Sequence, residues 1–219
     1  MNMSDAKVYD VIIIGGSYAG LSAALALGRS LRKVLVIDSG SPCNSQTPHS
    51  QNFLTQDGKS PIEIIMEAKN QLLKYNTLTF LKGLAVKGKK TVSGYAISTQ
   101  NGEEFLSRKL IFASGLKDIM PDIKGFAECW GISAIHCPYC HGYEFRQQKT
   151  AIMAETEKAF HLAQLVNNLT GDLTLVISAK ADFDEEQLRK LKKHNIKIIE
   201  SEVEAIEHEK GYLNKIIFK

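Results

Sequence analysis

Three things that this chain lacks limit what it can be. No apolar run in its 219 residues approaches the length needed to span a bilayer, which argues against a membrane protein. The start, residues 1–10, does not have the basic-then-apolar order of a signal peptide. Lysine and arginine are spread along the chain, the net charge is only +3, and no dense basic block indicates a nucleic-acid partner. We therefore expect a cytoplasmic protein that binds neither membranes nor nucleic acid.

Cysteine is also scarce, and the few cysteines are unevenly placed. Cys43 and Cys129 stand alone, whereas Cys137 and Cys140 are three residues apart in the stretch His136–His141, HCPYCH. A structural zinc site usually takes its ligands from two such pairs, and there is no second pair, so we predict no metal site. Two close thiols can form a small-ring disulfide and reopen it by exchange. The pattern predicts a redox-active dithiol, and so few cysteines fit a reducing cytoplasm.

The first part of the chain has the pattern of a βαβ unit. The apolar run 8–14 predicts a strand buried on both faces, and the glycine-rich turn 15–20 follows it at once. The alanine- and leucine-rich run 21–27 predicts a helix, and residues 33–37 predict a second buried strand. Asp38 stands at the carboxyl end of that strand.

The glycine turn points to a dinucleotide. Glycine allows backbone N–H groups at a helix start to approach a pyrophosphate, and Asp38 is placed to accept hydrogen bonds from an adenosine ribose. The turn reads G-x-S-x-x-G, with Ser17 at the usual middle glycine, and the alternative is a βα turn without a ligand. The candidate binding residues here are Gly15, Gly16, Ser17, Ala19, Gly20, Asp38 and Ser39.

The remaining pattern predicts two Rossmann-like units. In the first unit we expect a long loop at 39–59 and then a helix from the N-cap Ser60 to about Tyr75. Small antiparallel strands follow over 77–106, with turns that include Gly83 and Gly88, and a buried strand follows at 109–113. After a linker at 116–130, the second unit has the expected order strand, helix, strand, helix, strand and hairpin, at 150–154, 158–169, 173–177, 183–193, 196–199 and 202–219. The predicted fold is a three-layer α/β protein with domains at 1–117 and 118–219.

These parts, in this order, resemble the low-molecular-weight thioredoxin reductases, within the pyridine nucleotide-disulfide oxidoreductases. The resemblance rests on the turn 15–20 with Asp38, on Ala113-Ser114-Gly115, and on the cysteine pair that opens the second unit. The stretch 136–144, HCPYCHGYE, is especially similar to the branch that includes fungal dithiol oxidases. The resemblance implies FAD on the first unit, NADPH on the second, a homodimer, and a partner that carries a dithiol or disulfide, either a protein or a small molecule.

The resemblance also implies roles for single residues. Cys140 would face the flavin, Cys137 would attack the substrate disulfide, and His141 would act as general acid and base. Asn52, in the long loop, matches a flavin-side position. Ala113, Ser114 and Gly115 would also lie at the cofactor.

The chain departs from the family pattern in two places. The second glycine turn is replaced by Ala154–Ala159, AETEKA, whose Glu155 and Glu157 would repel a pyrophosphate, so we expect weak or absent NADPH binding. The chain also ends before the usual return to the FAD domain. The main hypothesis is a FAD-dependent thiol/disulfide oxidoreductase. The alternatives are an oxygen-using dithiol oxidase that does not depend on NADPH and a non-catalytic, truncated remnant.

Overall fold

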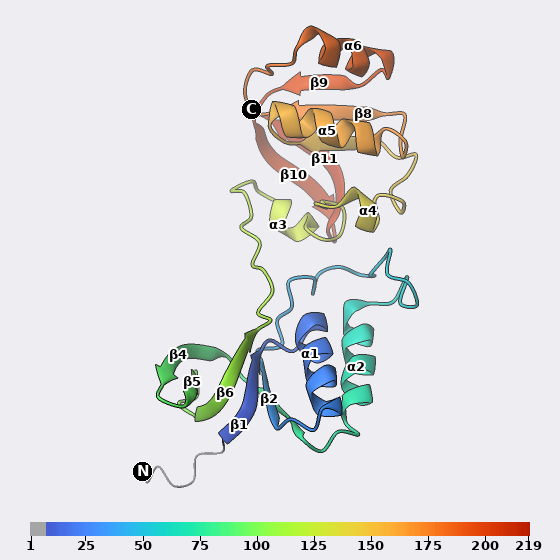
Figure 1. Cartoon of the computed structure of the whole chain (residues 1–219). Helices are drawn as coiled ribbons and strands as arrows, with labels where there is room; N and C mark the ends of the chain where they lie inside the picture. Colours follow the sequence, from blue (N-terminus) through green and yellow to red (C-terminus); the bar gives the residue numbers. More distant parts are fainter. Residues whose placement is uncertain (1–7) are drawn as a thin grey trace. The chain divides into compact units, whose positions relative to one another are not determined.

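The computed structural model describes residues 8–219, which form two compact units (Figure 1). Unit 1 contains the described residues up to Ser45 together with Ser60–Asp118, and unit 2 contains Gln46–Lys59 together with Ile119–Lys219. The loop 46–59, which we expected in the first domain, thus groups with unit 2. The first seven residues of the polar start lie outside the described residues.

Unit 1 is built on one mixed sheet of six strands. Its spatial order is β3-β2-β1-β6-β5-β4, with bounds β1 Val8–Ile14, β2 Val34–Asp38, β3 Leu78–Lys82, β4 Ala85–Thr91, β5 Gly94–Thr99 and β6 Glu104–Phe112. Strands β3, β2, β1 and β6 are parallel, and β5 and β4 continue antiparallel. The buried side chains of β1 and β2 lie at the centre of this sheet.

Two predictions about this sheet were wrong. β3, which was expected in an antiparallel set, pairs parallel to β2, because helix α2 supplies the crossover connection that parallel pairing requires. Gly88, which was expected in a turn, lies inside β4 opposite Ile97.

Helices α1 (Tyr18–Arg29) and α2 (Pro61–Leu72) lie side by side in unit 1 (Figure 1). The predicted capping box of α2 is confirmed, since Ser60 Oγ accepts the N–H of Glu63 and Glu63 Oε2 accepts the N–H of Ser60. The helix ends at Leu72 rather than Tyr75. One core cluster joins both helices to the sheet, and a second joins the parallel strands to β5 and β6. The sheet is therefore packed on both faces.

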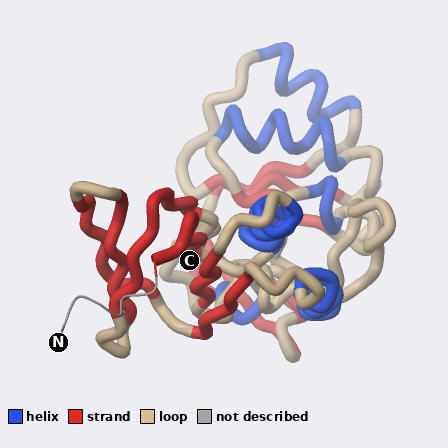
Figure 2. The backbone as a smooth tube through the Cα atoms, turned by 60° about the horizontal axis from the view of Figure 1, so that its bottom comes forward, coloured by secondary structure: helices blue, strands red, loops and turns tan. Residues whose placement is uncertain are grey.

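Unit 2 contains a three-stranded parallel sheet, in red in the paler part of Figure 2, in the order β7-β8-β9. Its strands are β7 Thr150–Met153, β8 Leu173–Ile177 and β9 Lys197–Glu200, and its longer helices are α5 Thr156–Val166 and α6 Glu185–Lys193. The predicted final hairpin is confirmed as β10 Val203–Glu209 paired with β11 Tyr212–Phe218. Short helices α3 (Phe126–Cys129), inside the expected linker, and α4 (Pro138–His141) precede the sheet. Across residues 8–219, no helix is long and apolar enough to cross a membrane.

Candidate functional site

The turn between β1 and α1 brings backbone atoms closer together than any side chain would allow. A Cβ atom added to Gly15 would lie 2.1 Å from the carbonyl oxygen of Ala113, and one added to Gly20 would lie 1.9 Å from the carbonyl oxygen of Gly15. Gly15 also has φ +105°, a conformation that side chains disfavour. Glycine is therefore required at both positions, because the backbone of this turn packs directly against other backbone atoms of the chain.

The start of α1 is suited to an anion. The first N–H groups of a helix have no intrahelical acceptor, and the helix dipole places partial positive charge there. The N-cap residue Ser17 makes no side-chain cap hydrogen bond, and the first turn of α1 contains no acidic residue. Together with the glycine turn, this arrangement fits a dinucleotide pyrophosphate.

The other candidate residues of unit 1 meet this turn at the carboxyl ends of three neighbouring strands. Asp38 ends β2, and its Oδ1 accepts the N–H of Gly16 at 3.2 Å. The N–H of Ala113, just after β6, donates to Ile14 at the end of β1. Ser39, Ser114 and Gly115 lie exposed next to these residues in the chain. Such an edge is where open α/β sheets bind ligands.

Asn52 is in a different place from the other flavin-side candidates. It lies in the loop 46–59, which belongs to unit 2, where Gln46 Nε2 donates to the carbonyl oxygen of Ala127 at 3.3 Å. The N–H of Asn52 donates to Asp57 Oδ1 within the same loop. The structure does not unite Asn52 with the glycine turn in one unit, and its contact with a flavin stays a prediction.

The cysteine pair lies at the start of α4. Cys137 is the N-cap and Pro138 the first helical residue, a position that proline favours because its missing N–H needs no partner there. The N–H of Cys140 donates to the carbonyl oxygen of Cys137 at 3.2 Å, which closes a tight turn between the two cysteines. Both are partly buried free thiols, whereas Cys129 is fully buried and Cys43 is exposed.

The two thiols are not equivalent. A hydrogen bond with Cys137, reinforced by burial and by the charge of Cys137, raises the pKa of Cys140 from 9.0 to about 11. Burial lowers the pKa of His141, partly opposed by Glu144 and helped by His136. Cys140 therefore holds its proton at neutral pH, and a neutral imidazole follows it in the chain. A protonated thiol beside a second thiol, with a neutral imidazole next in the chain, is compatible with dithiol exchange.

The order in which the thiols react follows from this difference. With reduced protein and less than one equivalent of iodoacetamide at about pH 8, we expect alkylation of Cys137 and little of Cys140, because only the thiolate is nucleophilic. Peptide mass spectrometry would measure the ratio, with exposed Cys43 as the internal reference thiol. Preferential alkylation of Cys140 would contradict the assignment. In protein whose Cys137 is not yet alkylated, the rate of alkylation of Cys140 should rise only as the pH approaches the Cys140 pKa of about 11.

The segment that leads to the dithiol is held at several points. The His136 ring stacks on Trp130 with centroids 5.6 Å apart, and Trp130 stacks on Phe126 at 5.8 Å. Between them, Ser133 Oγ donates to the carbonyl oxygen of Gly211 in the β10–β11 turn at 2.7 Å and accepts the N–H of Leu213 at 2.9 Å. The sequence interpretation missed this brace, because no local pattern links residues so far apart in the chain.

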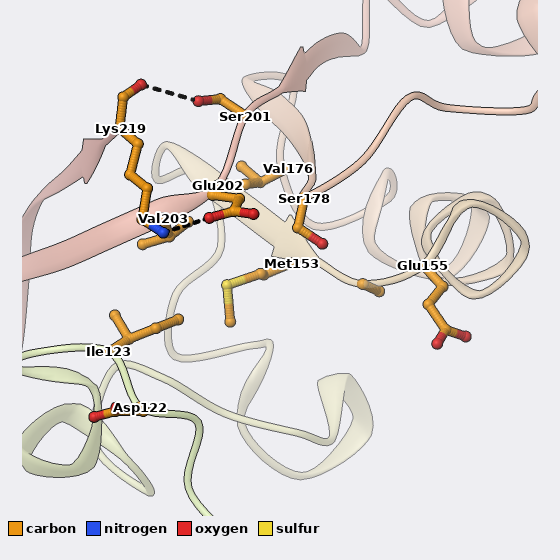
Figure 3. A pocket seen from close by; sticks show the side chains of 11 residues that line it. Asp122, Ile123, Met153, Glu155, Val176, Ser178, Ser201, Glu202, Val203 and Lys219 are labelled. Carbon is orange, nitrogen blue, oxygen red and sulfur yellow. Dashed lines mark hydrogen bonds and ion pairs between the residues drawn. The ribbon is translucent and has the colours of Figure 1, made fainter.

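The corresponding turn of unit 2 is acidic. Glu155 is the N-cap of α5 without a side-chain cap bond, and Glu157 lies in the first turn. A cavity of about 390 Å³ opens at the ends of β7 and β8, and its lining includes Asp122, Glu155 and Glu202 (Figure 3). Figure 3 shows Lys219 directed at Glu202, to which it is hydrogen-bonded, so this cation is already neutralised. Glu155 is itself paired with Lys158 Nζ at 3.2 Å, so the turn presents a pyrophosphate with carboxylates and with lysines that are already paired.

Metal ligation is a further use that clustered side chains can have. Within the described residues, no group of three or more His, Cys, Asp or Glu side chains is arranged to hold a metal ion.

The fold and these sites define a class: α/β proteins with a dinucleotide-type glycine turn and a CxxC dithiol. The model of the family "pyridine nucleotide-disulphide oxidoreductase" matches residues 9–217, and the chain belongs to that family. The predicted family resemblance is therefore confirmed.

Curated relatives include fungal proteins named thioredoxin reductases. The chain is 35% identical over 193 residues to thioredoxin reductase sirT of Leptosphaeria maculans, covering 82% of this chain and 59% of that protein. It is 38% identical over 181 residues to thioredoxin reductase tcpT of Claviceps purpurea, covering 79% and 56%. The chain thus spans less than two thirds of the length of these relatives.

Solved structures agree with the fold. An oxidoreductase from Agrobacterium tumefaciens matches with TM-score 0.87 and 37% identity, over 92% of this chain and 68% of that one. A putative thioredoxin reductase TrxB from Bacillus anthracis matches with TM-score 0.90 and 29% identity, over 95% and 70%. The predicted α/β class with two Rossmann-like units is confirmed.

Proposed function

We propose that the chain belongs to a flavin-dependent thiol/disulfide oxidoreductase and contains its dithiol and its dinucleotide turn. The observation that carries the proposal is the geometry of the pair: Cys137 and Cys140 are partly buried free thiols joined by a tight turn at the start of α4, and His141 follows Cys140 directly. Membership of the family and the names of the fungal relatives support it.

The thiol chemistry is two exchanges in sequence. In the reductive direction, the Cys137 thiolate attacks a substrate disulfide, and one substrate sulfur leaves as a thiolate and takes up a proton. Cys140 then attacks Cys137 Sγ, releases the second substrate thiol, and leaves the Cys137–Cys140 disulfide. Two electrons have then moved to the substrate. His141 accepts the proton that Cys140 loses, and the reverse sequence oxidises a dithiol.

FAD is the cofactor that unit 1 fits. Its pyrophosphate would lie against the turn Gly15–Gly20 at the start of α1, with the adenosine ribose at Asp38 and the strand end 113–115 nearby. FAD, when bound, supplies the two-electron acceptor or donor for the dithiol. A homodimer, a cytoplasmic location, and a protein or small-molecule dithiol or disulfide as partner complete the proposal, and they rest on the family resemblance and the sequence composition.

A second candidate is favoured by the acidic turn of unit 2. With Glu155 and Glu157 where a phosphate would bind, electrons from NADPH would enter poorly. The dithiol would then act as an oxidase: a substrate dithiol gives two electrons and two protons, and O₂ becomes H₂O₂. The product on the thiol side is a disulfide.

One set of measurements on the purified protein tests both candidates. The flavin proposal predicts that the purified protein absorbs at about 450 nm, as oxidised flavin does. One equivalent of dithiothreitol should bleach this absorbance in the absence of oxygen. The acidic turn predicts that one equivalent of NADPH does not bleach it at a rate that supports turnover. Peroxide formed from dithiothreitol in air would favour the oxidase.

Two other results would contradict these expectations. Rapid bleaching by NADPH would contradict the expectation of weak NADPH binding and favour the reductase. A protein that is colourless as purified and stays without flavin after incubation with FAD would contradict the flavin proposal and favour the non-catalytic remnant.

A further inference from the structure

Lys69, in the last turn of α2, contacts the acid at the end of β2. Its Nζ lies 3.2 Å from Asp38 Oδ2, both as a hydrogen bond and as a salt bridge. The Asp38 side chain is 24% exposed and the Lys69 side chain 40%, so a ligand can reach the pair from solvent. No sequence motif singled out Lys69, because it lies 31 residues from Asp38 in the chain.

The hydrogen bonds that Asp38 already accepts leave its carboxylate little capacity to accept more. Oδ1 accepts the N–H groups of Gly16 and Gly40, each at 3.2 Å, and Oδ2 accepts from Lys69. An ionised carboxylate offers about four lone-pair sites, so three are used and one remains, on Oδ2. Asp38 can therefore accept from one ligand hydroxyl while it keeps its present bonds.

A ribose presents two adjacent hydroxyl groups, and the second one needs another partner. A hydroxyl oxygen accepts hydrogen bonds as well as donating them, and an ammonium group has three N–H donors, of which Lys69 uses one on Asp38. We propose that Lys69 is a further dinucleotide-binding residue: Asp38 accepts from one ribose hydroxyl, and Lys69 donates to the other. This inference rests on the proposed binding of FAD to unit 1 and names the ligand class of that subsite, a vicinal diol.

The charge of Lys69 acts in the same direction. The Asp38 carboxylate lies against Gly16 in the turn where the pyrophosphate would bind, since a Cβ on Gly16 would be 2.7 Å from Asp38 Cγ. Unlike-charge pairing with Lys69 offsets the repulsion between this carboxylate and a doubly negative pyrophosphate. Without the lysine, the site would lose a donor to the ribose and gain a net negative charge.

The test is equilibrium binding of FAD to the full chain, followed by flavin fluorescence. Lys69→Met is expected to raise the dissociation constant about tenfold or more, because a hydrogen bond to a charged group is lost. Lys69→Arg, which keeps the positive charge and N–H donors, should stay within about threefold of the wild type. Lys89→Met, at an exposed lysine of β4 in the same unit, is the matched control and should leave the affinity unchanged.

A second measurement separates contact with the diol from a structural role. ADP and 2′,3′-dideoxy-ADP are compared as competitors of FAD in each protein, and Lys69→Gln is included in case the methionine variant folds poorly. The preference for ADP should be several-fold smaller in the Lys69 variants, since each charged hydrogen bond contributes to it. An unchanged preference, or wild-type affinity for FAD in both Lys69→Met and Lys69→Gln, would overturn the inference and leave the proposed function intact. A wild-type chain that binds no FAD would overturn the proposed function, and this inference with it.

Discussion

Cys137→Ser is expected to reduce disulfide turnover by roughly three orders of magnitude or more, the scale seen when a covalent nucleophile is removed. A serine hydroxyl does not ionise near neutral pH and cannot form a disulfide. Cys140→Ser should stop turnover equally but with a different product. Its Cys137 would still attack a substrate disulfide and would then stay joined to half of it, because the resolving thiol is missing.

The variants are first reduced and freed of reductant, and are then measured in a single turnover with 5,5′-dithiobis(2-nitrobenzoic acid), whose released thiolate is coloured; the dithiol itself supplies the two electrons. Intact-protein mass spectrometry, with peptide mapping, should find a stable adduct on Cys137 in the Cys140→Ser variant. In the Cys137→Ser variant, the remaining Cys140 is freed from the Cys137 charge that raises its pKa, and any adduct it forms stays unresolved and gives no turnover. Cys43→Ser is the matched control, since Cys43 is exposed and free but not part of the pair, and it should retain turnover. Full activity in Cys137→Ser would sink the proposed exchange chemistry.

Gly15→Ala is expected to have the second-largest effect. Its Cβ would lie 2.1 Å from the carbonyl oxygen of Ala113, at a φ of +105° that L-residues disfavour. The conformation alone costs about 1–2 kcal/mol, and relief of the clash must separate β1 from the chain after β6. We expect a loss of at least about 2 kcal/mol in unfolding free energy, with FAD binding reduced beyond detection because the turn can no longer approach a pyrophosphate.

Urea unfolding and flavin fluorescence would measure the two effects. Gly83→Ala is a control in the same unit, because a Cβ on Gly83 meets nothing within 4 Å. It should change stability by less than about 1 kcal/mol and leave FAD affinity as it is. If Gly15→Ala bound FAD like the wild type, the glycine turn would not be the pyrophosphate site.

Much of the fold was predictable because it depends on neighbours in the chain. The predicted strands 8–14 and 173–177 have the bounds of β1, in unit 1, and of β8, at the centre of the parallel sheet of unit 2. Both are short segments in which apolar residues predominate. The capping box at Ser60 was predictable for the same reason, since its two hydrogen bonds join residues three apart.

The errors arose where distant segments decide the outcome. The direction of β3 depends on the crossover through α2, and its short sequence would suit either direction. Gly88 has the composition of a turn, yet pairing with Ile97 keeps it in a strand. The loop 46–59 gave no signal that it would pack with unit 2.

The sequence by itself determined the dithiol, the glycine turn with its acid, and the acidic replacement of the second turn, because each is a matter of residue type and local spacing. Only the tertiary structure decided which distant side chains contact the acid of the glycine turn and the segment that leads to the dithiol. Lys69 reaches Asp38 across 31 residues, and Ser133 reaches Gly211 across 78. Such contacts depend on how helices and hairpins pack, and packing is a property of the whole chain that no short pattern contains.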